Sequence, residues 1–416
     1  EEGASFSLPV TVSVDAISLP DIALGGRIAG EVARLSANGS LEIADRPMRV
    51  DARLALARTD GREGTLDALL AYLPDENRID VKLNGAEPAG GVLANLLSLP
   101  GRPAVAVSFD GAGPLSDWQG NGTFSMDGKV VTELAARHRE TEAGRRIEAK
   151  GEGQFQQFLP EGLRPLLAGA SNIDLAATLG ANGAVAIERA QLASRAVEIT
   201  ASGQYDPAGA NDLSLGVETP GGPVPLHLGE GAGMAYFSLA GWQARLFGPA
   251  DAAAVDASLT LPQLSYGDYA AEGVVVSAHS DAFDLGTQSG AFDLKLDASA
   301  AGSANETVAA LLAGEVGASG RVTVDADTIR FGNLAIRTGT VSARGDGSFA
   351  RGDGAVSAQV AAEILSTALP AALRNALDRT VRIAGNVARG ADGALSVSGL
   401  DLRSGSLQVS GDASLA

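Results

Sequence analysis

The stretch LLSLPGRPAVAVSFDGAGPLSDWQG, residues 96–120, contains the pattern that decides the fold. In its middle, Val105, Val107 and Phe109 are separated by single small or polar residues. Successive side chains of a β-strand point to opposite faces, so this period of two predicts a strand with one apolar and one polar face. Before the strand, a Pro-Gly-Arg-Pro segment ends a short apolar helical pattern. After it, Trp118 is expected to pack on the apolar end of the strand.

The same alternation recurs along the chain. It is seen at Val10, Val12 and Val14; Val50, Ala52, Leu54 and Leu56; Ile79, Val81 and Leu83; Ile173, Leu175, Ala177 and Leu179; Val255, Ala257, Leu259 and Leu261; Phe292, Leu294 and Leu296; Val322 and Val324; and Val356, Ala358 and Val360. Strands with one apolar and one polar face are typical of antiparallel sheets. Four pairs predict the hairpin turns between them: Asn38-Gly39, Asp60-Gly61, Asn84-Gly85 and Asp392-Gly393.

The composition of the 416-residue chain fits many short strands with small side chains. Hydrophobic residues make up 45% of it and aromatic residues only 4%, while 53 residues are glycine. The apolar content is therefore mainly Ala, Val and Leu with frequent chain reversals, and it is too high for a disordered chain.

The charge of the chain limits the kinds of partner that it can bind. Fifty Asp and Glu against 31 Lys and Arg give a formal charge of −19, which disfavours nucleic acid as a partner. Cysteine is absent from the sequence, which excludes disulfides and thiolate metal sites. No run approaches the roughly 20 apolar residues that span a bilayer. Because the chain opens on Glu1, we expect it to be part of a longer protein.

Short helical patterns interrupt the strands. They cover Leu66 to Leu73, Val92 to Leu97, Leu163 to Leu167, Thr307 to Leu312 and Ile364 to Leu377. Most are shorter than the ~12 residues at which helices begin to persist alone, so we expect them to dock as plugs or lids over the ends of the sheet.

A weak internal repeat suggests a stacked, elongated architecture. IERAQLASRAVEI from Ile187, FGNLAIRTGTVSA from Phe331 and VSGLDLRSGSLQV from Val397 share apolar residues at offsets 0, 5, 10 and 12. Each has a hydroxyl residue at offset 7, namely Ser194, Thr338 and Ser404. Such self-similarity favours continuous stacking over separate globules. We expect an N-proximal segment, residues 1–180, and continuing repeats over residues 181–416, with no true linker between them.

The residues that could perform chemistry are scattered. His138, His227 and His279 are predicted to be isolated, and no nucleophile elbow, P-loop or zinc-protease motif is present. Asp325 and Asp327 lack the rest of a calcium loop. We therefore expect no enzymatic activity, no catalytic residue, no metal site and no cofactor. The Arg-Gly-Asp triplets at residues 344–346 and 351–353 leave open an alternative, a structural or adhesive surface protein of stacked β-sandwich or β-repeat units.

Two long stretches resemble a known family. SLPVTVSVDAISLPDIALGGRIAGEVARLSANGSLEI and NGAEPAGGVLANLLSLPGRPAVAVSFDGAGPLSDWQG are similar to the periplasmic region of the TamB family, the inner-membrane subunits of the translocation and assembly module. The similarity covers about residues 6 to 125 and extends beyond them only as a strand pattern. The family is related to the AsmA-like and repeating β-groove proteins.

The resemblance implies a fold and a function. The fold would be mainly β: an elongated antiparallel β-groove, or β-taco, with an apolar trough and short interspersed helices. The function would be bridge-like phospholipid transport through the periplasm between the inner and outer membranes of a Gram-negative bacterium, and outer-membrane assembly with the barrel partner TamA. The resemblance also implies an N-terminal inner-membrane anchor and a segment for TamA, both expected outside this chain.

The residues agree with this expectation on physical grounds. Each CH₂ of an acyl chain exposed to water costs about 0.8 kcal/mol, so carrying a phospholipid requires a continuous apolar lining. Small aliphatic side chains at every second position would supply one, and an acidic outer surface would keep it soluble. The candidate lining residues are Val105, Val107, Phe109, Ile173, Leu175, Val255, Leu259, Leu261, Phe292, Leu294, Leu296, Val322 and Val324.

Overall fold

A computed structural model describes residues 11–30, 32–45, 47–391 and 393–415, and it confirms a mainly β protein, with 66% of the described residues in strands. The chain divides into two compact units, Glu1–Ala196 (unit 1) and Val197–Ala416 (unit 2). The predicted division after residue 180 falls in the turn that follows Leu179.

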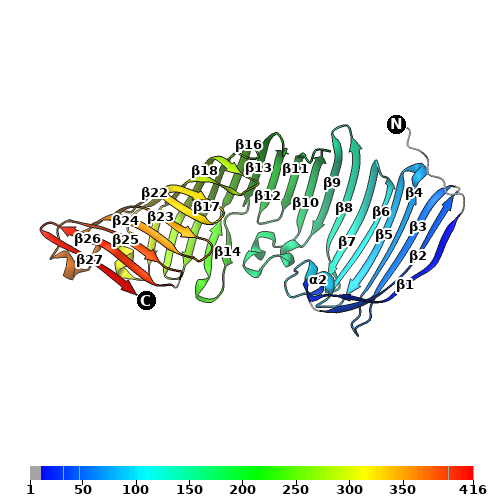
Figure 1. Ribbon diagram of the computed structural model, residues 1–416, viewed down its shortest axis with the longest axis horizontal. Helices are drawn as coiled ribbons and strands as arrows, with labels where there is room; N and C mark the ends of the chain where they lie inside the picture. The colour runs from blue at the N-terminus through cyan, green and yellow to red at the C-terminus, as the bar shows by residue number, and fades with distance from the viewer. Residues whose placement is uncertain (1–10, 31, 46, 392, 416) are drawn as a thin grey trace. The chain divides into compact units, whose positions relative to one another are not determined.

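Unit 1 is an antiparallel meander in which each strand pairs with the next along the chain (Figure 1). Its strands are β1 (Val12–Leu24), β2 (Ala33–Asp45), β3 (Met48–Arg58), β4 (Thr65–Leu73), β5 (Arg78–Glu87), β6 (Val105–Pro114), β7 (Asp117–Met126), β8 (Lys129–Thr141), β9 (Gly144–Gly153), β10 (Ser171–Leu179) and β11 (Val185–Ala193). Its helical segments are α1 (Gly26–Ala29), α2 (Val92–Leu96) and the 3₁₀ turns η1 (Pro74–Glu76), η2 (Phe155–Phe158) and η3 (Glu161–Leu167).

Unit 2 is also an antiparallel sheet, with two local rearrangements. Its strands are β12 (Glu198–Tyr205), β13 (Ala210–Glu218), β14 (Val224–Leu228), β15 (Ala235–Leu239), β16 (Gly241–Pro249), β17 (Ala253–Tyr266), β18 (Tyr269–Asp284), β19 (Ser289–Ala298), β20 (Ala300–Ser303), β21 (Val316–Val324), β22 (Thr328–Arg337), β23 (Val341–Ala350), β24 (Val356–Leu365), β25 (Thr380–Arg389), β26 (Leu395–Ser404) and β27 (Leu407–Leu415). The long strand β17 pairs with both β15 and β16, and β18 pairs with both β19 and β20. From β21 to β27 each strand pairs with the next.

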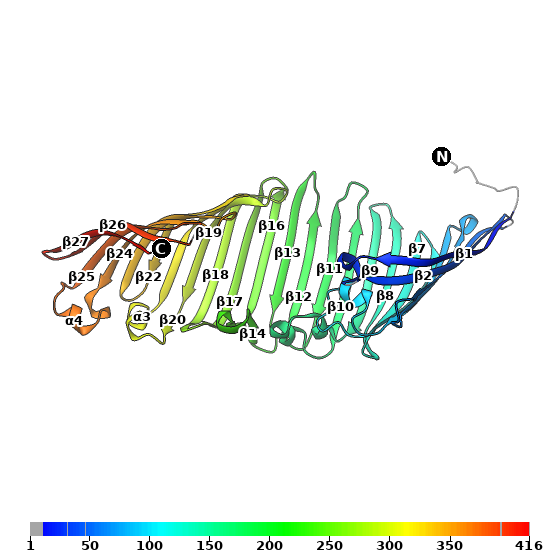
Figure 2. The same cartoon turned by 60° about the horizontal axis from the view of Figure 1, so that its bottom comes forward.

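The helical segments of unit 2 are α3 (Glu306–Leu311), α4 (Ala371–Arg374) and the 3₁₀ turns η4 (Gly231–Gly233) and η5 (Ser366–Ala368). α3 and α4 lie at the same end of the strands (Figure 2). The hydroxyl at offset 7 of the repeat ties helices to this end: Thr338 Oγ1 donates to the carbonyl of Leu311 at 2.7 Å. In unit 1, Ser194 Oγ does the same to Leu166 at 2.8 Å. In these two copies of the repeat the hydroxyl therefore fastens a helical segment to a hairpin turn, whereas Ser404 Oγ accepts a hydrogen bond of 2.8 Å from the N–H of Asp378.

The sheets are open single layers. The chain exposes 24206 Å², against the roughly 15,000 Å² expected for a compact protein of this mass. The small core of unit 1 lies under α2, where Ala94, Leu99, Val105, Met126 and Val131 are buried together. The described strands thus form an open layer, not two sheets packed face to face.

Several local predictions need correction. Residues 66–73 were predicted as a helix but lie in the strand β4. A short apolar run is compatible with a helix or a strand, and here pairing with β3 and β5 selects the strand. Asn38-Gly39 and Asn84-Gly85 lie inside β2 and β5 rather than in turns. Each asparagine accepts a hydrogen bond from a serine of the neighbouring strand, from Ser18 at 3.0 Å and Ser108 at 2.9 Å. Val10 and Asp392 lie outside the described residues.

The other helical predictions fare better. Residues 92–97 and 307–312 correspond to α2 and α3, and residues 163–167 lie in the 3₁₀ turn η3. The pattern at residues 364–377 is only partly helical, because it begins in β24 and is divided by Pro370 into η5 and α4.

Candidate functional site

The strand register of unit 1 places the predicted lining residues on one face. Residues that oppose each other in an antiparallel pair share a face of the sheet. Phe109 opposes Gly122, which is followed on the next strands by Leu134, Gly151 and Ile173. Phe109 and Ile173 therefore stand in one row across five strands. We call the side that carries this row the apolar face of unit 1.

A second row of the same face consists of small residues beneath an indole ring. The row begins at Gly111 in β6 and continues, one residue per strand, through Gly120, Ala136 and Ala149 to Leu175 in β10. Trp118 lies over Gly111, where an added Cβ would be 2.1 Å from its ring. The ring stacks on Phe109 at 5.7 Å, and its Nε1 donates to the carbonyl of Ile79 at 3.0 Å. The prediction that Trp118 packs on this strand is confirmed.

Unit 2 has an apolar face of the same kind. Leu259 opposes Val276, which opposes Leu296, which opposes Ala318. The remaining candidates belong to parallel rows of this face: Leu294 opposes Ala278 and Gly320, Phe292 opposes Val322, Val324 opposes Gly290, Val255 opposes Ser280, and Leu261 opposes Val274. Within each unit, the register brings the predicted residues together.

The predicted lining residues differ in how open they are. Val105 and Leu261 are buried, with 3% and 8% of their surface exposed. The other eleven are half-buried. Val105 is covered because it belongs to the packed cluster under α2, so it marks the closed end of the face rather than its open part.

Sequence reasoning missed several residues that complete the two faces. Leu134 in β8, Leu215 in β13 and Trp242 in β16 lie in the same rows as the predicted residues. The period of two is present in each of these strands, so the signal was available in the sequence. In β8 it is weakened by three consecutive apolar residues, Leu134 to Ala136.

The opposite face of each sheet is polar and carries ion pairs between neighbouring strands. Arg137 forms an ion pair with Asp117. Arg189 Nη2 lies 2.7 Å from Asp174 Oδ1, and Arg245 Nη2 lies 3.0 Å from Asp212 Oδ2. The hydrogen bond from each arginine keeps the pKa of its aspartate below the usual range. Because these pairs are close to half exposed, each adds little stability, and their main effect is to favour the observed register.

The prediction that His279 is isolated is wrong. The Nδ1 atom of His279 lies 2.6 Å from Asp256 Oδ1, and its Nε2 atom lies 3.1 Å from Asp281 Oδ1. Asp256 is the cross-strand neighbour, which a search along the sequence for ligand spacing does not detect. The hydrogen bond to Asp256, followed by that to Asp281, raises the pKa of the imidazole.

Over the residues that the structure describes, no three His, Asp or Glu side chains are grouped so that they could hold a metal ion. Over the same residues, no helix is both long and apolar enough to cross a membrane.

Comparison of the chain with protein-family models, with curated proteins and with solved structures finds no match.

Proposed function

We propose that the apolar face of each unit forms a trough that shields phospholipid acyl chains. The observation that carries this proposal is the strand register. It aligns apolar residues of successive strands in rows on one face of the sheet, and most of the side chains in these rows are only half-buried. An ordinary globular protein would cover such a face with a second layer. Here a hydrocarbon chain would take the place of that layer.

The energetics favour acyl chains as the occupant. Transfer of a hydrocarbon chain from water to an apolar surface gains about 0.8 kcal/mol per CH₂. Rows built from Leu, Val, Ala and Gly supply apolar area without filling the space above the sheet. The ion-paired polar face keeps the other side of each sheet in water.

The wider biological role rests on the sequence resemblance. By analogy with the TamB family, we infer bridge-like phospholipid transport through the periplasm, between the inner and outer membranes, together with outer-membrane assembly. On this proposal TamA is the outer-membrane partner, through parts outside this chain, and an N-terminal helix outside this chain provides the anchor. We also infer that the chain is not an enzyme and needs neither a cofactor nor nucleic acid.

Two adjacent residues of β17 provide the decisive experiment. Leu259 is half-buried on the apolar face, and Ser258 is exposed on the polar face. A photo-crosslinking amino acid at residue 259 should capture phospholipid in cells, whereas the same group at residue 258 should not. Mass spectrometry of the crosslinked protein would identify the lipid. Equal capture at both positions, or none at residue 259, would refute the trough.

Charge substitution at the same two positions separates a trough from a packed core. In an open trough the carboxylate of Leu259→Asp can reach water, so the fold should survive while co-purifying lipid is lost. Ser258→Asp, which adds the same charge to the polar face, should keep the lipid. If Leu259→Asp instead abolishes a cooperative melt, then the face is packed rather than open, because a buried unpaired carboxylate costs several kcal/mol. Leu175→Asp and Leu294→Asp repeat the test in β10 and β19.

The adhesive alternative retains one supporting observation. The triplet Arg351 to Asp353 lies in the exposed turn between β23 and β24, whereas the triplet Arg344 to Asp346 lies inside β23. Cell binding that a soluble Arg-Gly-Asp peptide blocks would favour adhesion.

A further inference from the structure

Unit 2 has an uneven distribution of charge. Residues 197–320 contain 15 Asp and Glu but only two basic residues, Arg245 and Lys295, for a formal charge of −13. Residues 321–416 contain ten basic residues, all arginine, and nine acidic ones, for a formal charge of +1. An anion therefore meets less electrostatic repulsion in the second of these parts than in the first. Arginine is also the side chain best suited to bind oxyanions through paired hydrogen bonds.

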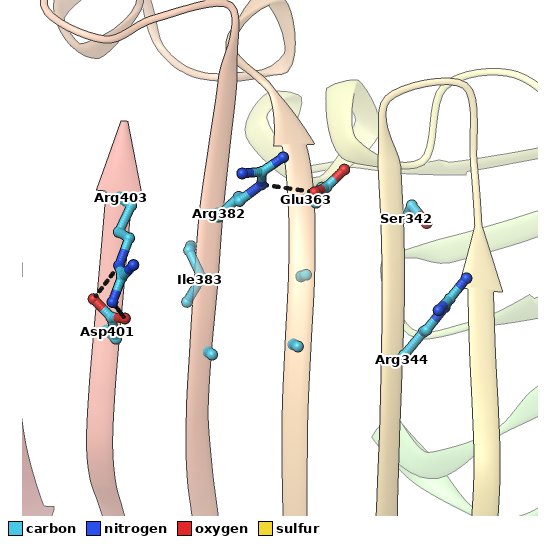
Figure 3. A pocket seen from close by; sticks show the side chains of 10 residues that line it. Ser342, Arg344, Glu363, Arg382, Ile383, Asp401 and Arg403 are labelled. Carbon is cyan, nitrogen blue, oxygen red and sulfur yellow. Dashed lines mark hydrogen bonds and ion pairs between the residues drawn. The ribbon is translucent and has the colours of Figure 1, made fainter. Parts of the chain in front are cut away.

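The arginine-containing part has a cavity of about 560 Å³ on its polar face, formed by β23, β24, β25 and β26 (Figure 3). Two transverse rows of side chains build it. The first row is Arg344, Ala361, Ala384 and Asp401, and the second is Ser342, Glu363, Arg382 and Arg403. The cavity exists because the two middle positions of the first row are alanines, which leave space between longer side chains on either side.

Two of the three arginines in the cavity are held in place by carboxylates. Arg382 Nε donates to Glu363 Oε1 at 2.7 Å. Arg403 makes a two-point contact with Asp401, with Nη2 2.7 Å from Oδ2 and Nε 3.2 Å from Oδ1. A guanidinium has five N–H donors, so both arginines keep donors for a ligand. Their carboxylates also keep lone pairs that can accept hydrogen bonds.

Arg344 differs from these two. Among the described residues, no hydrogen bond or ion pair of its side chain is observed, and the side chain leans away from Arg382 and Arg403, toward β22 (Figure 3). Its cross-strand neighbours are Ala335 and Ala361, which cannot compensate its charge. The lining groups therefore comprise three guanidinium groups and two carboxylates, with one positive charge in excess.

We propose that this cavity binds a phosphate ester carried on a small hydroxyl-bearing group, such as glycerol phosphate or a sugar phosphate. On this proposal the side chain of Arg344 swings over Ala361 to supply the uncompensated charge for the phosphate, and the free donors of Arg382 and Arg403 add hydrogen bonds. Glu363 and Asp401 accept hydrogen bonds from the hydroxyl groups, which a bare phosphate lacks. The cavity volume is within the range of small-molecule sites, and the adjoining acidic part repels longer polyanions.

This inference is separate from the proposed trough. Arg344, Glu363 and Arg382 lie on the polar face, while acyl chains would occupy the opposite side of the same strands. The phosphate ester could be a free metabolite or the headgroup of a lipid in a neighbouring membrane, and the two sources can be distinguished experimentally.

Titration calorimetry at low ionic strength tests the proposal with three soluble probes: sn-glycerol 3-phosphate, inorganic phosphate and glycerol. We expect glycerol 3-phosphate to bind more tightly than inorganic phosphate, and glycerol not to bind. Arg344→Ala should weaken binding of glycerol 3-phosphate by about tenfold, the effect of losing a charge-assisted contact. Arg344→Lys should also weaken it, because the charge remains but the planar donor pair is lost.

The matched control is Arg389→Ala, which removes the same charge from β25 outside the cavity and should keep the affinity within about twofold. Sedimentation with vesicles of phosphatidylcholine, with and without phosphatidylglycerol, identifies the source. Binding to phosphatidylglycerol vesicles that depends on Arg344 supports a lipid headgroup, and binding only to soluble glycerol 3-phosphate supports a free metabolite. No binding of any phosphate probe, equal affinity for inorganic phosphate, or unchanged binding by Arg344→Ala would overturn the proposal. Leu259→Asp should leave this binding intact, so failure here is distinguishable from failure of the trough.

Discussion

The backbone N–H of Asn333 donates a hydrogen bond of 2.7 Å to Oδ1 of Asp346 on the neighbouring strand. Asn333 has a φ of 54° and sits in a bulge between Phe331 and Leu334. The bulge places Phe331 and Leu334, which are three residues apart, on the same apolar face. The same arrangement recurs in β26, where the N–H of Gly399, with a φ of 62°, donates to Asp412 Oδ1 at 2.7 Å. In each of these two bulges, a hydrogen bond to a carboxylate thus stabilises the backbone conformation that keeps the apolar rows continuous.

The two bulges should be weakened by removing their carboxylates. We expect Asp346→Ala and Asp412→Ala each to lower the free energy of unfolding by about 1 kcal/mol, because a donor in a left-handed backbone conformation loses its partner. Urea unfolding followed by circular dichroism measures the change. Asp346→Asn retains a side-chain oxygen and should lose less. Equal midpoints for wild type, Asn and Ala variants would show that the contact does not stabilise the bulge.

The turn hydroxyl of the repeat should be needed to dock α3. Thr338 Oγ1 donates to Leu311 O and accepts from the N–H of Val341 at 2.9 Å. In Thr338→Val the amide of Val341 loses this partner, while Thr340 still contacts the Leu311 carbonyl at 3.0 Å. We expect a loss of about 1 kcal/mol and faster amide hydrogen exchange in residues 306–312. Thr260→Val, the same change at an exposed strand position, is the control; equal exchange in both variants would contradict this role.

The glycine beneath Trp118 should tolerate no side chain. A Cβ at Gly111 would come within 2.1 Å of the indole, so Gly111→Ala must displace the ring from Phe109. In a Trp242→Phe background, we expect the fluorescence of Trp118 to shift to longer wavelength and the melting temperature to fall. Gly25→Ala places a methyl group in open space and should change neither. An unchanged emission spectrum in Gly111→Ala would mean that the indole does not occupy this position.

His279 should make the stability of unit 2 depend on pH. The neighbouring carboxylates of Asp256 and Asp281 raise its pKa above 6.5. A group whose pKa is higher in the folded state stabilises the fold fully below its unfolded pKa, and this contribution disappears as the pH rises through the folded pKa. We expect NMR titration to place the His279 midpoint above that of an unfolded histidine. His279→Gln should remove this part of the pH dependence of the melting temperature, and an unchanged dependence would rule the histidine out as its source.

The alternation of Val105, Val107 and Phe109, and of the other candidate rows, predicted the strands and their two faces from local sequence alone. That prediction succeeds because side-chain direction in a strand has a fixed period. The Asn-Gly pairs at residues 38–39 and 84–85 show where local reasoning fails. Their turn preference is real, but pairing on both sides of β2 and β5 outweighs it. The cavity around Arg344 was invisible from the sequence, since its rows bring together residues from four strands.

The sequence by itself determined that the chain forms antiparallel strands with one apolar face, because composition and a period of two are local properties. It also determined the repeated hydroxyl at Ser194, Thr338 and Ser404. Only the tertiary structure decided which rows align, which lining residues are covered, and what the hydroxyls bind. Those outcomes depend on register and on bulges such as that of Asn333, where a hydrogen bond to a carboxylate thirteen residues further along the chain sets which side chains share a face.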